Sequence, residues 1–154
     1  MNDEKFTIHI EDNSELVKEA LKLATEKSLM LAGTNAVRYV TEYMSKPDFT
    51  GRDIVDTGRL RASISFSTME YQSGLNDEAV AESSPSDALT EFPQLPNSVI
   101  VGTNVDYAQA VEFGKKTDSG VMTAGRYYLS NGIQLSLPET EDGVKSIMKG
   151  ESIA

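Results

Sequence analysis

The residues best suited to chemistry lie in two short stretches. Arg59 and Arg61 follow Asp56 in the first stretch, and Asp106 and Glu112 belong to the second. Such a set could transfer protons or hold a phosphate. The sequence, however, has no phosphate-cradling loop of the Gly-x-x-x-x-Gly-Lys type, no nucleophile elbow and no metal-ligand cluster. We therefore predict that the protein is not an enzyme, and that one arginine forms a charge-assisted hydrogen bond with a carboxylate of the second stretch.

Composition narrows the chemistry further. The chain of 154 residues has no cysteine, which excludes disulfides and thiolate metal sites. A single histidine, His9, cannot build a His-rich metal site or a conventional catalytic triad. We therefore expect no cofactor. No apolar run approaches the length of a membrane span, and the polar, acidic N-terminus is unlike a signal peptide, so we expect a protein without a membrane partner.

The net charge of −10 argues against a primary nucleic-acid binder, because neutralising phosphates requires clustered Lys and Arg. The charge leaves one alternative open, an acidic binding module that mimics nucleic acid and acts on a host protein. Such a mimic needs carboxylates at phosphate-like spacing on an ordered face. Here the densest acids, which include Asp77, Glu78 and Glu82, lie in a segment rich in Pro and Ser.

The N-terminal part of the chain predicts a strand and then a long helix. Apolar and polar residues alternate over residues 6–10, as in a half-buried strand. Asp12 and Glu15 have the spacing of a capping box at a helix start. Apolar residues then recur at every seventh position, namely Leu16, Leu23, Met30, Val37 and Met44. A helix over residues 14–46 would be roughly 50 Å long, so it either bends near Gly33 or reaches a neighbour.

The apolar stripe of this helix favours packing on a sheet over a self-associating coiled coil. Lys27, Thr34 and Thr41 occupy the alternate heptad positions, so the second seam of a coiled coil would be polar. If the stripe is buried, Asp in place of Leu23 or Val37 should unfold the protein, because it would bury an uncompensated charge.

The middle of the chain predicts a short helix and two strands. Residues 59–61 suit a helical turn after Gly58, and serines alternate with apolar residues at the start of a strand over residues 64–71. The β-branched residues 99–101 predict a second strand. Between the strands, residues 72–97 are acidic and rich in Pro and Ser. We predict a projecting loop or β-arm there that reaches a neighbouring subunit.

The C-terminal part predicts short helices. The first covers residues 108–113 and stops at Gly114. A helical turn over residues 127–133 is expected to break at residues 131–132, and a last helix is expected over residues 138–150, opened by proline. The whole chain, residues 1–154, is thus predicted to be one α+β domain. Its mainly antiparallel sheet is packed by one long N-terminal helix and by short helices.

Three motifs of the chain resemble a known family. Residues 56–64 read Asp-Thr-Gly-Arg-Leu-Arg-Ala-Ser-Ile, residues 101–108 read Val-Gly-Thr-Asn-Val-Asp-Tyr-Ala, and residues 111–114 read Val-Glu-Phe-Gly. On these motifs, in this order, the chain resembles the HK97 gp10-like family of tailed-bacteriophage neck and tail-completion proteins, which join head to tail. The family tends to continue with Ala-Arg-Pro-Phe-Leu, whereas residues 124–129 here read Ala-Gly-Arg-Tyr-Tyr-Leu and lack the proline.

The resemblance implies a structural virion protein that forms a homo-oligomeric ring, with six subunits as the expected number. The implied partners are head-closure or connector proteins and tail terminator or tail tube proteins, with DNA passing through the ring without specific binding. The implied location is the neck or tail of the virion, and the host cytoplasm during assembly. The candidate structural and interface residues are Arg59, Arg61, Asp106, Tyr107, Glu112, Phe113, Asp77, Glu78 and Glu82.

Overall fold

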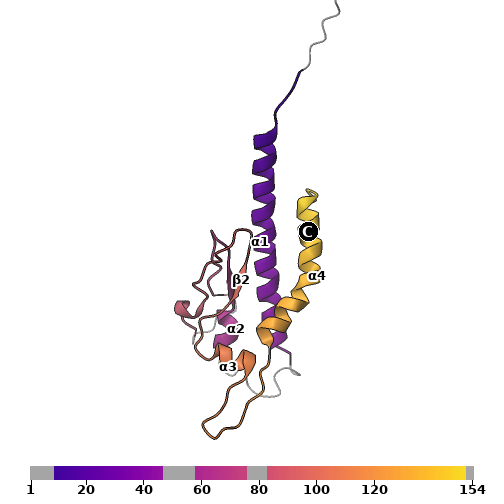
Figure 1. Cartoon of the computed structure of the whole chain (residues 1–154). Coiled ribbons are helices and arrows are strands. Elements are labelled where there is room, and N and C mark those ends of the chain that lie inside the picture. The colour runs from indigo at the N-terminus through magenta and orange to yellow at the C-terminus, as the bar shows by residue number, and fades with distance from the viewer. Residues whose placement is uncertain (1–8, 47–57, 76–82, 152–154) are drawn as a thin grey trace, which may run out of the picture.

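A computed structural model describes residues 9–46, 58–75 and 83–151 of the chain. The fold is α+β, as predicted, with a long N-terminal helix, short helices and a two-stranded antiparallel sheet (Figure 1). In chain order the elements are α1 (Ser14–Met44), α2 (Arg59–Ser63), β1 (Ser65–Ser67), the 3-10 turn η1 (Pro85–Asp87), β2 (Ile100–Gly102), α3 (Ala108–Phe113) and α4 (Tyr128–Met148). None of the helices in the described ranges is both long and apolar enough to cross a membrane.

The two longest helices, α1 and α4, lie side by side and run in opposite directions (Figure 1). Gly132 of α4 allows close packing, because a Cβ atom there would lie only 2.5 Å from the Cα of Val40. Polar contacts continue the pairing, since Asn35 donates a hydrogen bond to Thr140 and Arg38 pairs with the Glu139 carboxylate at 2.6 Å. The C-terminal half of α1 is therefore fixed along one side by α4.

The small sheet covers another side of α1. β1 and β2 pair antiparallel with Phe66 opposite Val101, and Phe66 packs against α1 at Gly33. The core lies where α1, α2, α3 and α4 meet. Its buried members are Val40, Met44, Leu60, Ile64, Val105, Ala108 and Tyr128.

The predicted long helix agrees closely with α1, which ends two residues before the expected boundary at residue 46. Gly33 does not interrupt it. The predicted first strand is not seen in the described part of the chain, because residues 9–10 are not in a strand and residues 6–8 lie outside the described ranges. Burial of Leu23 was also predicted wrongly, since its exposed fraction is 52%.

The serine face of β1 is covered rather than solvated. Ser63, Ser65 and Ser67 are fully buried. Residues 83–91 lie over them, with the Leu89 N–H donating to the Ser65 hydroxyl at 2.7 Å and the Ser67 hydroxyl donating to the Glu91 carbonyl. A long loop between the two strands is present, as predicted. Its residues 83–91 pack on β1 instead of projecting, because buried serine hydroxyls need hydrogen-bond partners and this segment supplies them.

The C-terminal helix was predicted wrongly in two places. α4 runs without interruption through residues 131–132 and through Pro138, so one helix replaces the predicted turn and final helix. Proline removes one helical hydrogen bond and commonly bends a helix, and Figure 1 shows α4 changing direction along its length. The predicted end is correct, because Gly150 follows α4 with a φ of 74° and donates to the Ile147 carbonyl.

Candidate interaction surface

Arg59 is the centre of a fixed polar bridge between α2 and the segment that covers the serines. Its guanidinium forms two hydrogen bonds with the Asp87 carboxylate, at 2.9 and 2.7 Å. Asp87 is buried and also accepts the Ser84 N–H at 3.0 Å. The hydrogen bond from Arg59, followed by that from Ser84, lowers the pKa of Asp87 to about 2. The carboxylate therefore stays charged and paired under ordinary conditions.

The predicted partner of this arginine is present but secondary. Asp106 lies 3.6 Å from the Arg59 guanidinium and its side chain is 82% exposed. The ring of Tyr107 lies 5.8 Å from the same guanidinium, within range of a cation–π contact. Sequence reasoning missed Asp87, although the run from Ser84 to Asp87 is a capping box with proline at its start. That signal would have predicted an ordered turn there.

Glu112 makes a different contact from the predicted pair with an arginine. Its carboxylate is buried and accepts the N–H groups of Leu129 and Ser130, at 2.9 and 3.1 Å, and the Ser130 hydroxyl. These are the first N–H groups of α4, which have no partner inside the helix. Burial, the main cause, and the nearby Glu112 charge raise the pKa of Tyr128. Glu112 thus attaches α4 to the end of α3.

The other predicted residues lie around the same junction. Arg61 donates to the Ser45 hydroxyl at 3.0 Å and links α2 to the end of α1. Phe113 is 60% exposed and meets the ring of Tyr127 edge-on. The described ranges contain no group of three or more His, Cys, Asp or Glu side chains that could hold a metal ion. This arrangement suits a rigid structural junction. Three further candidates lie outside the described residues, namely Asp77, Glu78 and Glu82.

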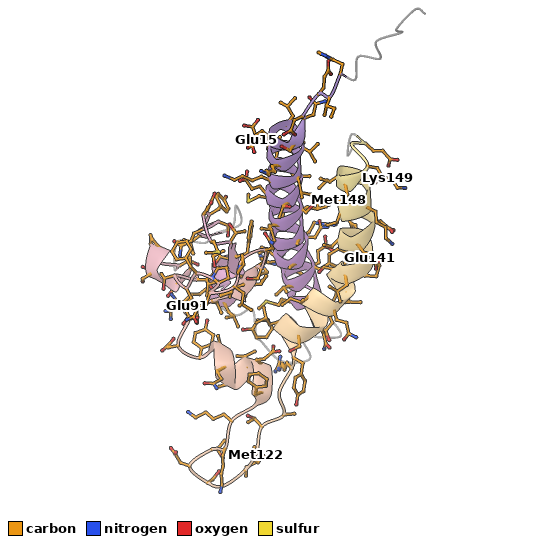
Figure 2. The ribbon with its side chains drawn as sticks, turned by 45° about the horizontal axis from the view of Figure 1, so that its top comes forward. Glu15, Glu91, Met122, Glu141, Met148 and Lys149 are labelled. Atoms are coloured by element: carbon orange, nitrogen blue, oxygen red, sulfur yellow. The ribbon has the colours of Figure 1, made fainter. Side chains whose placement is uncertain are left out.

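The N-terminal part of α1 exposes several large apolar side chains. We define the open half of α1 as residues 14–27. Its large apolar side chains are more than half exposed, at 65% for Leu16, 63% for Val17, 54% for Leu21 and 52% for Leu23. Met148, at the neighbouring end of α4, is 54% exposed (Figure 2). Such a concentration of exposed apolar side chains on one helix segment indicates an interaction site in a folded protein.

A groove runs along each side of the open half. One, of about 620 Å³, lies between α1 and residues 68–71 and 96–97. The other, of about 890 Å³, lies between α1 and the end of α4, where Leu23 faces Ile147. Both grooves extend the surfaces by which the C-terminal half of α1 already packs on the sheet and on α4. Further protein elements would fit here without any change of the helix.

The open half of α1 carries no net charge within an acidic protein. Residues 14–27 contain three Glu and three Lys. They alternate along the helix, with Glu15 paired to Lys18 at 2.7 Å and Lys22 to Glu26 at 3.8 Å. Charge repulsion is therefore weak here when two acidic copies of the chain approach each other.

Comparisons of the chain with models of protein families, with curated proteins and with solved structures gave no match. A functional proposal therefore rests on the motifs of the sequence and on the geometry described above.

Proposed function

We propose that this protein is a structural component of a tailed-phage virion, a ring-forming neck or tail-completion subunit that joins the head connector to the tail. The motifs at residues 56–64, 101–108 and 111–114 support the family. The open half of α1 is the structural observation that carries the proposal, because it is a preformed helix segment whose large apolar side chains are more than half exposed in the described chain.

Burying the apolar side chains of the open half would give a favourable free energy of assembly. Complete burial of one large apolar side chain contributes about 1.5 to 3 kcal/mol. Four such side chains of the open half are more than half exposed, so covering them would contribute several kcal/mol before the cost of association. The face is also neutral, so copies of an otherwise acidic chain can meet there.

The three motifs have a structural role that fits this proposal. Arg59 in the first motif bridges α2 to Asp87, and Glu112 in the last motif holds the start of α4. The first contact holds α2 against the segment that covers the sheet, and the second holds α4 on α3, so the elements packed around α1 keep a fixed arrangement. In the proposed function the protein needs no cofactor and performs no catalysis.

The proposal specifies the partners. The subunit binds other copies of itself in a ring of about six, and the ring contacts connector or head-closure proteins on one side and tail terminator or tail tube proteins on the other. DNA passes through without specific binding, in keeping with the net charge of −10. The protein is thus located in the virion neck or tail after assembly in the host cytoplasm.

The oligomeric mass of the purified protein tests this proposal, measured by light scattering with and without the neighbouring virion proteins. We expect a closed oligomer of defined mass, and we expect the protein in purified particles at a fixed copy number. A protein that stays monomeric in every mixture and is absent from particles would contradict the proposal.

A further inference from the structure

The hairpin of residues 114–125 projects from the end of the molecule opposite to the start of α1. Figure 2 labels Met122 at one end and Glu15 at the other. The hairpin has its own hydrogen bonds, with the Thr117 N–H donating to the Val121 carbonyl at 2.8 Å and the Thr123 N–H donating to the Lys115 carbonyl at 2.9 Å. Its own backbone hydrogen bonds therefore give the hairpin a defined conformation, although it has no hydrophobic core of its own.

The base of the hairpin is clamped by close backbone packing. Gly114 has a φ of 83°, and a Cβ atom there would lie 2.1 Å from the Thr123 carbonyl oxygen. A Cβ atom on Gly125 would lie 2.5 Å from the Glu112 carbonyl oxygen. Only glycine fits at either position, so the hairpin is held in one direction relative to α3. A held projection loses little conformational entropy when it binds.

The hairpin carries exposed apolar side chains beside basic ones, and Met122 pairs directly across from Lys116. Val121 and Met122 are 61% and 67% exposed. Residues 114–125 contain two Lys against a single Asp, whereas the whole chain has a net charge of −10. The hairpin is therefore a local positive projection on a negative protein, and an acidic, apolar surface would complement it.

The opposite end of the molecule offers such a surface. Residues 10–19 contain four acids, Glu11, Asp12, Glu15 and Glu19, against a single lysine. Ile10 at this end is 84% exposed, and Leu16 and Val17 are 65% and 63% exposed. Both ends thus combine apolar side chains with charge, and the charges have opposite sign.

We propose that the hairpin of one copy docks on the first turns of α1 of the next copy. This inference rests on the proposed self-assembly and names the surface that covers part of the open half. The hairpin cannot reach α1 of its own copy in this way, because α1 alone, with 31 residues, separates the two ends by about 46 Å. A contact between two different surfaces of identical chains can close into a ring, which a contact of one surface with itself cannot do beyond a dimer.

A nucleic acid is the other partner that a basic hairpin would suit. It would neutralise Lys115 and Lys116, but it would gain nothing from the exposed apolar side chains Val121 and Met122, and it would leave the acidic end of α1 uncovered. The second copy accounts for both ends, so we favour it and include the nucleic acid among the outcomes of the test.

Covalent trapping provides the first test. The chain has no cysteine, so the double variant Val17→Cys, Met122→Cys carries the only two thiols. On mild oxidation we expect a ladder of covalent oligomers on a non-reducing gel. A mixture of the two single variants should give dimers and no ladder. Absence of cross-linking at a concentration where the protein assembles would overturn the inference and leave the proposed function standing.

Charge reversal provides the second test. The variant Lys115→Glu, Lys116→Glu should associate at least about tenfold more weakly, measured by light scattering in low salt. Adding Glu15→Lys and Glu19→Lys should restore association. The control adds Glu141→Lys and Asp142→Lys instead. These changes on α4, away from both ends, alter the net charge by the same amount but should not restore association. Normal association of the lysine variant, together with lost binding to duplex DNA, would overturn the inference in favour of nucleic acid.

Discussion

Gly33 of α1 lies directly against the ring of Phe66, and a Cβ atom on Gly33 would come within 2.1 to 2.5 Å of three ring atoms. The ring has no room to move away, because Phe66 is 4% exposed and also contacts the ring of Tyr71. The glycine is therefore present for close packing of helix on sheet, and the helix continues through it.

We predict that Gly33→Ala destabilises the protein. Alanine improves helix propensity by about 1 kcal/mol, whereas overpacking a filled core costs about 1 to 3 kcal/mol. The net loss in free energy of unfolding should be about 1 kcal/mol, measured by urea denaturation. Gly143→Ala in α4 is the matched control, because the only close atom there is the methyl end of Leu31 and a flexible side chain can move. Equal stability of the two variants would contradict this account.

The Arg59–Asp87 bridge predicts a pH dependence. The pKa of Asp87 in the folded protein is about 2, below the ordinary value of 3.8. Protons therefore bind the unfolded chain more readily, so the bridge contributes its full stability above about pH 4 and loses it as the pH falls through 2. Thermal unfolding measured from pH 7 to pH 2 should show a fall in melting temperature that is smaller in the variant Asp87→Asn.

At neutral pH Asp87→Asn should cost about 1 to 3 kcal/mol, because a buried arginine contact loses its charged acceptor. Asp106→Asn removes the exposed partner of the same arginine, at 3.6 Å, and should cost less than about 1 kcal/mol. The bridge would be of no consequence to stability if both variants melted like the wild type across the whole pH range.

Patterns within one segment of the sequence predicted α1 well. They failed for α4, whose length depends on packing against residues distant in the sequence. The seven-residue recurrence from Leu16 to Met44 is a property of one helix, and it placed α1 within two residues of its ends. Gly132 and Pro138 are breakers in an isolated helix. In α4, Gly132 instead packs against Val40, and this tertiary contact outweighs its low propensity.

The same limit applies to the candidate site. Arg59 or Arg61 was predicted to pair with a carboxylate such as Asp106 or Glu112, because these residues lie in the marked motifs. Arg59 and Asp106 do lie 3.6 Å apart, whereas Glu112 binds N–H groups of α4. Asp87 could not be paired with Arg59 from sequence, because its position depends on how residues 83–91 fold over buried serines such as Ser65. Hydrogen bonds between segments distant in sequence leave no periodic pattern to read.

We predict that Glu112→Gln weakens the attachment of α4. An amide offers one acceptor oxygen, and its NH₂ group would face the N–H groups of Leu129 or Ser130, which are donors themselves. Leaving such a group without a partner costs about 1 to 3 kcal/mol. Glu141→Gln is the control, because that carboxylate is exposed and pairs only with Lys145 on the same helix. Thermal unfolding of both variants, followed by circular dichroism, should show a clear loss of stability for the first and no clear change for the second.

Substitutions at two apolar positions of α1 should affect folding and assembly separately. Val40 is fully buried in the core, so Val40→Asp should unfold the protein, at a cost of several kcal/mol for an unpaired buried charge. Leu23 lies in the open half and is 52% exposed, so Leu23→Asp should leave the helix content and the folded monomer intact. In an assembled ring the same aspartate would bury a charge in the groove beside Ile147, and the oligomeric mass measured by light scattering should fall. If Leu23→Asp assembled like the wild type, the open half of α1 would not be a subunit interface.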